Sequence, residues 1–360
     1  MTHAPFPLIE IAGVPHARGV SYGLQARDRI AKSTTLYGGA LMAFGVGDAG
    51  LKDLVRQFLP KIEDFAPEAI AEMRGIAEGA GQSLEAIVLV NARTELLQLA
   101  KRQAAARDGC TGAVLLPAIT RSGKLIHGQN WDWRAECVET GIVLKVRRDD
   151  GPDVLTFTEA GGLARSGLNS LGHAITANYI DSDRDYRSLG VPLPFIRRKA
   201  LEASSLAEMI RIVAATPISA SNCMMLSHRD GFAVALERAP DEAFPIPAVD
   251  GLLTHANHFE SPAALAKLKD TSLADTPDSL YRAVRIRELL SGRQGRLDAD
   301  ALKAAFRDDF GAPFSICRPV VEEGGNLGAT VASIVMTPAE GLMEICPMPS
   351  ENEVFTSYRV

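Results

Sequence analysis

The 360-residue sequence lacks a framework of paired cysteines. Its five cysteines are an odd number at the irregular positions 110, 137, 223, 317 and 346, and no two of them form a C-x-x-C pair. Disulfide scaffolds need paired cysteines and an oxidising compartment. We therefore expect free thiols and a reducing location, for which the cytoplasm is the default.

Long hydrophobic runs and an excess of positive charge are also absent. No apolar run approaches the roughly 20 residues needed to cross a bilayer, and the first residues do not have the pattern of a secretory signal. The net charge of -6 argues against nucleic-acid binding, which usually requires a basic face. We expect neither a membrane nor a nucleic acid as partner, and the sequence leaves a homo-oligomer open.

Hydrophobic periodicity divides the chain into a helical first part and a largely strand-forming remainder. After a strand at 6–12, helical spacing covers 20–44, 51–59, 67–79 and 83–101. Later strands are expected at 111–118, 125–133, 142–148, 154–159, 163–168, 173–179, 222–227, 232–237, 252–255, 331–337 and 342–346. Further helices are expected at 194–202, 205–215 and 277–290, the last beginning at Pro277. No linker rich in Pro, Gly or Ser separates two domains, which indicates one layered α/β unit.

The tetrad Asp108-Gly109-Cys110-Thr111 stands where the helical part gives way to the strands. If the bond between Gly109 and Cys110 is cut, Cys110 carries both a thiol nucleophile and a free α-amine. That amine has a pKa of about 7.7–8.0, so near neutral pH it can accept the thiol proton. The thiol can make the cut itself by attacking the carbonyl of Gly109, whose backbone is permissive, while Asp108 positions water or orients the thiol. Because most lone cysteines are structural, the other motifs decide the interpretation.

Asn130-Trp131-Asp132-Trp133 holds both tryptophans of the chain, at the end of an expected strand. Side chains alternate between the two faces of a strand, so Asn130 and Asp132 are expected on one face and the two indoles on the other. Asp132 could hold the new α-ammonium group or bind a cationic group of the substrate. Packing aromatics beside a turn-forming aspartate explain these residues equally well.

The sequence HANH at 255–258 follows another expected strand. Asn257 could stabilise an oxyanion, because a side-chain amide is a neutral, directional donor. Taken alone, the segment is better explained as a polar loop. Its two histidines have no supporting Cys, Asp or Glu, so no metal site is predicted, and no cofactor is expected.

The sequence FSICR at 314–318 places a serine and an arginine three residues apart. At a fixed loop position, Arg318 suits a carboxylate held by two parallel hydrogen bonds. A surface loop with a structural ion pair explains the segment equally well. Arg282, in the helix expected at 277–290, is interpreted as a buried residue that supports a loop and not as a catalytic one.

In this order, the motifs resemble the acyl-coenzyme A:6-aminopenicillanic acid acyltransferase family, whose members are autoproteolytic cysteine enzymes of the N-terminal-nucleophile (Ntn) type. The resemblance runs from the segment at 15–23 to the last strands. Its points are DGCT at 108–111, GQNWDW at 128–133, TEAG at 158–161, the stretch at 219–222, HANH at 255–258 and FSICR at 314–318. Fungal members carry a second threonine where Gly112 stands here, so one hydroxyl near the cysteine is missing.

The resemblance implies an α+β fold, namely a four-layer αββα sandwich with antiparallel sheets in one domain of residues 1–360. It also implies self-cleavage into 1–109 and 110–360, two fragments that stay together as partners. By position, Cys110 is the nucleophile with its own amine as base, Asn257 the oxyanion donor, and Asp132 and Arg318 residues that orient Cys110 or the substrate. The implied supporting or substrate-binding residues are Asp108, Thr111, Ser221 and Ser315.

We therefore expect an amidohydrolase or acyltransferase that takes an acyl group from a small amide or thioester onto Cys110 and passes it to water or an amine. One alternative is an acyl-coenzyme A-dependent N-acyltransferase acting on amines such as 6-aminopenicillanate. A second is a conventional Cys–His hydrolase that stays uncut and uses His127, His173 or His255 as its base. A third is a binding protein on the same scaffold, in which Cys110 is merely buried.

Overall fold

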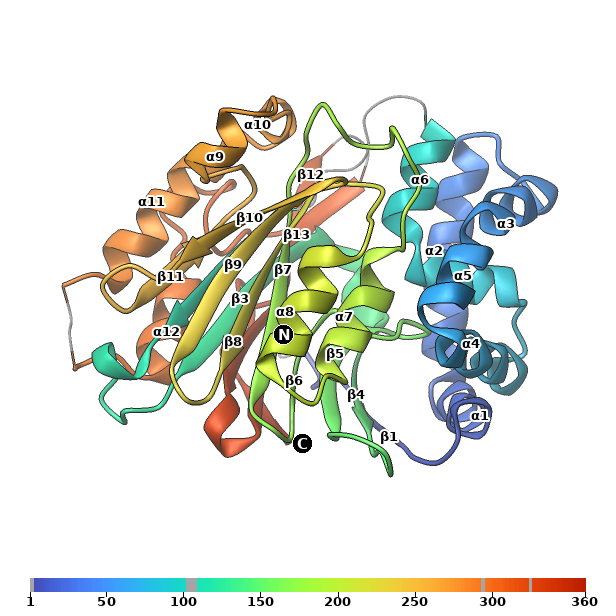
Figure 1. The fold of residues 1–360 in the computed structure, drawn as a ribbon, viewed down its shortest axis with the longest axis horizontal. Coiled ribbons are helices and arrows are strands. Elements are labelled where there is room, and N and C mark those ends of the chain that lie inside the picture. The colour runs from blue at the N-terminus through green and yellow to red at the C-terminus, as the bar shows by residue number, and fades with distance from the viewer. Residues whose placement is uncertain (1–2, 102–108, 293–294, 324–325) are drawn as a thin grey trace.

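The computed structural model describes residues 3–101, 109–292, 295–323 and 326–360. Two β-sheets pack face to face at its centre (Figure 1). Helices α7 and α8 cover the outer face of one sheet, and α11 and α12 cover the outer face of the other. The four-layer αββα sandwich expected from the sequence is therefore confirmed, and helices α1 to α6 form a further bundle at one side of it.

Sheet A has eight strands in the spatial order β1-β4-β5-β6-β7-β8-β9-β10. Its strands are β1 Leu8–Ile11, β4 Gly141–Val146, β5 Val154–Glu159, β6 Ser166–Asn169, β7 His173–Tyr179, β8 Asn222–His228, β9 Phe232–Ala239 and β10 Glu242–Pro247. Neighbouring strands are antiparallel except β1, which pairs with β4 in parallel. The sheet is thus nearly, but not wholly, of the expected antiparallel kind, and β1, one of its two edge strands, comes from the segment before Cys110.

Sheet B has seven antiparallel strands, six of them in the order β11-β2-β3-β13-β14-β15, with β12 paired to β13. Its strands are β2 Gly109–Leu115, β3 Ile126–Arg134, β11 Leu252–His255, β12 Val321–Glu323, β13 Asn326–Thr337, β14 Leu342–Pro347 and β15 Thr356–Arg359. β2, which contains Cys110, lies between β11 and β3.

The α-helices are α1 Pro15–Gln25, α2 Arg27–Ala43, α3 Asp48–Phe65, α4 Pro67–Ala80, α5 Leu84–Asn91, α6 Arg93–Lys101, α7 Leu193–Leu201, α8 Leu206–Ala215, α9 Pro262–Leu265, α10 Ser272–Asp275, α11 Ser279–Leu290 and α12 Ala299–Phe306. The helix expected at 20–44 is two helices, because the backbone leaves the helical region at Ala26 (φ −110°, ψ 16°). None of the described helices combines the length and the apolar character needed to cross a bilayer.

Both indoles of the NWDW motif are buried on the same face of β3, Trp131 against sheet A and Trp133 against the helical bundle. Trp131 packs edge-on against Phe157 of sheet A at 5.5 Å between ring centroids, and the Trp133 indole donates to the Tyr37 hydroxyl at 3.0 Å. Asn130 points the other way and donates to the backbone of the 306–316 region. The alternation predicted for this strand is confirmed.

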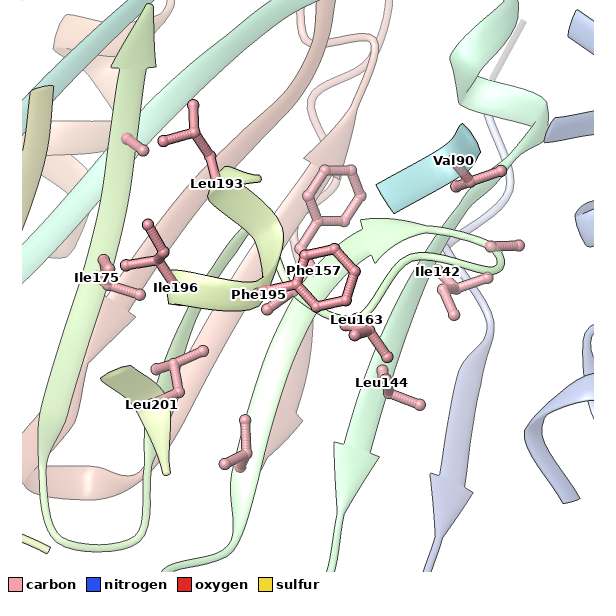
Figure 2. Close-up of a cluster of buried hydrophobic side chains, with 14 of the residues drawn as sticks. Val90, Ile142, Leu144, Phe157, Leu163, Ile175, Leu193, Phe195, Ile196 and Leu201 are labelled. Carbon is pink, nitrogen blue, oxygen red and sulfur yellow. The ribbon is translucent and has the colours of Figure 1, made fainter. Parts of the chain in front are cut away.

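Apolar packing joins the helical layer to sheet A. Phe195, Ile196 and Leu201 of α7 are fully buried in one cluster with Ile175 of β7. Figure 2 shows Ile196 beside Ile175, on the face of sheet A that α7 covers. Each large aliphatic or aromatic side chain buried in this way contributes roughly 1.5–3 kcal/mol. This packing holds α7 against β7, whose last residue, Tyr179, lies next to the site described below.

Helices α1 and α4 cross at unusually short range. At Gly75, an added Cβ would overlap the carbonyl oxygen of His16 and lie 2.8 Å from the backbone nitrogen of Val20. At Gly19, it would overlap the carbonyl oxygen of Glu72 in the opposite helix. Only glycine lets the two backbones touch in this way, so these residues set the distance between the helices.

Candidate active site

The predicted site residues meet because of how the strands of sheet B pair. Cys110 is the second residue of β2, and the antiparallel ladder places Gly109 opposite Asp132 and Cys110 opposite Trp131. Asn257 lies just after β11, the other neighbour of β2. Residues far apart in the chain therefore surround the Gly109–Cys110 peptide bond.

Asn257 and Arg282 hold the backbone of Cys110 on both sides. The Cys110 nitrogen donates to Asn257 Oδ1 at 2.7 Å, and its carbonyl oxygen accepts from Arg282 Nη1, also at 2.7 Å. Arg282 Nη1 also donates to the Thr111 hydroxyl at 3.0 Å, and its Nη2 donates to Asn257 Oδ1 at 2.9 Å. Because Arg282 is fully buried, its planar guanidinium fixes these groups in one geometry.

Acidic and basic side chains alternate behind the cysteine. Arg282 Nε pairs with Asp278 at 2.8 Å, Asp278 also pairs with Arg318, and Arg318 Nε lies 3.2 Å from Asp132 Oδ2. Although burial opposes ionisation, Arg282 and Arg318 lower the pKa of Asp278. Removing one partner of a buried ion pair is strongly destabilising, because the other partner is left as an unpaired buried charge. The network therefore holds its members in place.

Asp132 is buried as well. Its Oδ1 accepts from the Thr330 hydroxyl at 2.6 Å. Burial raises the pKa of Asp132, while Arg318, Arg282 and the Thr330 hydrogen bond work in the opposite direction. Opposing influences therefore act on the pKa of this carboxyl group. A new positive charge beside it, such as a liberated α-ammonium group, would lower that pKa and favour the carboxylate.

A side chain at position 109 would crowd the ion pair of Asp132 and Arg318. A Cβ added to Gly109 would lie 2.9 Å from Asp132 Oδ2 and 3.0 Å from the guanidinium carbon of Arg318. Any side chain would push the ion pair away from the peptide bond. The glycine before the cysteine therefore has a steric role, in addition to the backbone freedom that the sequence suggested.

Asn257 is itself held on its other sides. Its Nδ2 donates to the Tyr179 carbonyl at the end of β7, at 2.8 Å, and its backbone nitrogen donates to the Ser279 hydroxyl at 2.7 Å. One hydrogen of the side-chain amide remains for a further acceptor. Its role as an oxyanion donor stays a prediction.

The other residues predicted for the site make hydrogen bonds elsewhere or are not described. Ser315 donates to the carbonyl of Cys317 at 2.6 Å and so shapes the loop that carries Arg318. Ser221 bonds the carboxylate of Asp185, at 2.5 Å through its hydroxyl. Asp108 lies outside the described residues.

Gly112, the departure from the fungal pattern, faces a methionine. A Cβ at this position would lie 2.6 Å from Met225 Sδ and 3.6 Å from Asn178 Oδ1. Met225 therefore occupies the space that a larger residue at position 112 would need.

Sequence reasoning missed three members of the site. Arg282 was interpreted as a loop support, and neither Asp278 nor Thr330 was predicted. The expected helix begins at Ser279 and not at Pro277, and the Asp278 carboxylate makes no cap hydrogen bond because two guanidinium groups engage it. The i,i+4 spacing of Asp278 and Arg282 was the available signal.

The three histidines considered as bases for an uncut hydrolase have other partners. His127 lies between the hydroxyls of Ser227 and Thr176, at 2.8 and 2.9 Å. His255 contacts Glu237 at 2.9 Å through Nε2 and the carbonyl of Ala256 at 2.9 Å through Nδ1, so both of its ring nitrogens are engaged. Although burial opposes protonation, Cys223 and Glu237 raise its pKa well above the usual value.

His173 begins β7, at the end of that strand opposite to Tyr179. Its Nδ1 contacts the side-chain amide of Asn169 at 3.1 Å. Six residues of extended strand span about 20 Å, so His173 lies far from the peptide bond that Asn257 and Tyr179 adjoin.

His127 makes a pH-dependent contribution to stability. Burial lowers its pKa to about 3, so between pH 6.5 and 3 the unfolded chain binds a proton that the folded side chain rejects. The free energy of unfolding should therefore fall as the pH falls through this window, by about 2–3 kcal/mol at pH 4.5. Urea unfolding of an uncut Cys110→Ala chain at pH 7 and pH 4.5 measures the fall. His127→Gln should show a correspondingly smaller one, and an equal fall in both proteins would contradict this assignment.

The sequence is similar to those of known proteins. The sequence pattern of the family "Acyl-coenzyme A:6-aminopenicillanic acid acyl-transferase" matches residues 119–349. The 40 kDa form of acyl-coenzyme A:6-aminopenicillanic-acid-acyltransferase from Emericella nidulans is 32% identical over 329 residues, which cover 90% of this chain and 87% of that protein.

Solved structures resemble the chain in fold. A conjugated bile acid hydrolase from Clostridium perfringens matches with a TM-score of 0.50 and 14% identity, covering 70% of this chain and 92% of that one. A Caenorhabditis elegans ortholog of N-acylethanolamine-hydrolyzing acid amidase has a TM-score of 0.45 and 16% identity, covering 64% and 93%. The bile acid hydrolase likeness shows the Ntn-hydrolase fold. Because the family pattern matches more than half of the chain and the Emericella nidulans relative is 32% identical over 90% of it, the chain belongs to the acyl-coenzyme A:6-aminopenicillanic acid acyltransferase family.

Proposed function

We propose that this protein cuts itself between Gly109 and Cys110 and then works as an Ntn-type amidohydrolase or acyltransferase with Cys110 as its nucleophile. The observation that carries the proposal is the set of contacts around one peptide bond. The Cys110 nitrogen faces Asn257 Oδ1 at 2.7 Å, and Arg282 holds the carbonyl on the other side of the same residue. A structural cysteine in a strand needs no such arrangement around its own nitrogen.

Self-cleavage begins with attack of the Cys110 sulfur on the Gly109 carbonyl carbon. The carbon–nitrogen bond then breaks, the Cys110 nitrogen takes up the proton given up by the thiol, and a thioester joins the two residues. Water opens this thioester and leaves a carboxylate on Gly109 and a free thiol. Arg318, which a Cβ on Gly109 would overlap, lies where it can face the charge that develops at this carbonyl.

Turnover of a substrate repeats the chemistry with the new α-amine as base. The amine accepts the thiol proton, the sulfur attacks the substrate carbonyl, and the leaving amine takes the proton as the acyl-thioester forms. Asn257 Oδ1 then accepts a hydrogen bond from the α-amine and aims its lone pair at the sulfur. Arg282 keeps Asn257 in this orientation, so it acts as a positioning residue.

The acyl group finally passes to water or to an amine. Hydrolysis is the slightly favoured outcome, because bulk water at about 55 M competes unless a second site positions the amine. Transfer to an amine is the second candidate, supported by the name of the Emericella nidulans relative, which is an acyltransferase. An uncut Cys–His hydrolase finds less support, since His127 and His255 have partners at both ring nitrogens.

Intact mass and N-terminal sequencing of the purified wild-type protein test the proposal. The expected result is two fragments, one ending at Gly109 and one whose first residue is Cys110. A screen of N-acyl amides and acyl-thioesters, with and without an added amine, then separates hydrolysis from transfer. An unbroken chain that still turns over an amide would overturn the proposed mechanism.

A further inference from the structure

A polar cavity lies where sheet A meets helices α6 and α7. Its charged lining comprises Arg93, Glu95, Glu159, Arg165 and Arg197. The first two precede Cys110 in the chain and the other three follow it. The cavity holds about 30 Å³, the room of a few atoms and not of a whole substrate.

The lining combines three guanidinium groups with two carboxylates. Glu159 is shared, because its Oε2 accepts from Arg93 Nε at 3.0 Å and from Arg165 Nη2 at 3.4 Å. Glu95 accepts a hydrogen bond from the backbone nitrogen of Leu193 at 3.2 Å. Burial raises the pKa of Glu95, although Arg197 and Arg93 oppose this effect.

Arg165 of the cavity lining contacts the indole of Trp131, which is a neighbour of Cys110. Trp131 is the cross-strand neighbour of Cys110 on the face of sheet B that looks towards sheet A. The Arg165 guanidinium stacks on that indole at 4.2 Å from the ring centre. Since directly opposed side chains have Cβ atoms about 5 Å apart, the guanidinium lies on the order of 10 Å from the sulfur.

Two polar residues at the ends of β7 and β8 also line the cavity. Tyr179 receives a hydrogen bond from Asn257 at its carbonyl, so it links the cavity wall to the nitrogen of Cys110. Asn222 Oδ1 is buried and has no hydrogen-bond partner among the described residues. It can accept from a substrate N–H, as an amide would offer.

We propose that this cavity binds a carboxylate of the substrate, so that the enzyme acts on amides or thioesters that carry an acidic group a few bonds from the reacting carbonyl. Guanidinium groups suit a carboxylate because they donate two parallel hydrogen bonds. The bound carboxylate would lie among the guanidinium groups of Arg93, Arg165 and Arg197. The inference rests on the proposed function, since it requires Cys110 to be the reacting residue.

The test compares two alkylating reagents of nearly equal size on the cut protein: iodoacetate, which is an anion, and iodoacetamide, which is neutral. In both, the Cys110 thiolate displaces iodide and forms a carbon–sulfur bond, so any change in the thiol pKa cancels in the ratio of the two rates. Peptide mapping assigns the adduct to Cys110. The iodoacetate-to-iodoacetamide ratio should exceed that of a short peptide with an N-terminal cysteine by about tenfold.

Arg165→Gln should lower the ratio by about threefold to tenfold, and Arg165→Lys, which keeps the charge, should restore most of it. Arg197→Gln is a second variant with the same expected effect, should the first fold poorly. The matched control is Arg56→Gln, on the exposed face of α3, which should leave the ratio unchanged.

A cut protein that reacts normally with iodoacetamide but has the same ratio in every variant would overturn the carboxylate site and leave the proposed function standing. A chain that stays uncut, with Cys110 unreactive towards both reagents, would overturn the proposed function and the carboxylate site with it.

Discussion

Cys110→Ala is expected to give one uncut chain of 360 residues without activity on any amide substrate. The substitution removes the sulfur that attacks Gly109 and also the nucleophile that would attack the substrate. Without the cut, the nitrogen of residue 110 stays an amide and cannot serve as a base. The loss should be complete within detection, as expected when a covalent nucleophile is removed. Intact mass reports the cut, and release of an amine from an N-acyl amide reports turnover.

The matched control for this variant is Cys346→Ser. Cys346 is another buried cysteine, and its thiol donates to the Asn352 carbonyl, a contact that serine can keep. The control should be cut and active. If Cys110→Ala were still split at the same bond, or still turned over substrate, Cys110 would not be the nucleophile.

Gly75→Ala should strongly destabilise the fold. The new Cβ would overlap the backbone of α1, which cannot move aside as a flexible side chain could. Overpacking typically costs about 1–3 kcal/mol, and because backbone is met here we expect at least about 3 kcal/mol. Urea unfolding on the uncut Cys110→Ala background measures this change without interference from cleavage.

The control for the helix crossing is Gly39→Ala in α2. Gly39 is exposed, and an added Cβ there meets nothing within 4 Å. In an open helical position, alanine is better than glycine by up to about 1 kcal/mol, so this variant should be as stable as the parent or more so. Equal effects at both positions would mean that the crossing of α1 and α4 does not depend on Gly75.

Sequence periodicity predicted those parts of the fold that depend on neighbouring residues. The alternation in β3, with Asp132 on one face and Trp131 on the other, follows from strand geometry alone. β10 (Glu242–Pro247) was not predicted, because Pro245 and Pro247 argue against a strand. Such residues are tolerated only at a sheet edge, and an edge is known only once the sheet is assembled.

The candidate site could be predicted only in part, for a similar reason. Cys110, Asp132, Asn257 and Arg318 stand in motifs that can be recognised along the chain, and the structure places them around one peptide bond. Arg282 belongs to no such motif. Its guanidinium reaches Cys110 only because α11 packs on sheet B, a tertiary contact that local spacing does not encode.

The parallel pairing of β1 with β4 bears on what becomes of the piece that ends at Gly109. The ladder runs from Leu8 opposite Val143 to Ile11 opposite Val146. It pairs the amino-terminal fragment with a sheet whose other strands all come from the carboxy-terminal fragment. Cleavage between Gly109 and Cys110 would make the β1–β4 pairing, together with the apolar packing around it, an interface between two subunits without changing its contacts. The two fragments should therefore stay associated on dilution. They would form a heterodimer whose subunits folded as one chain and did not assemble from separate partners.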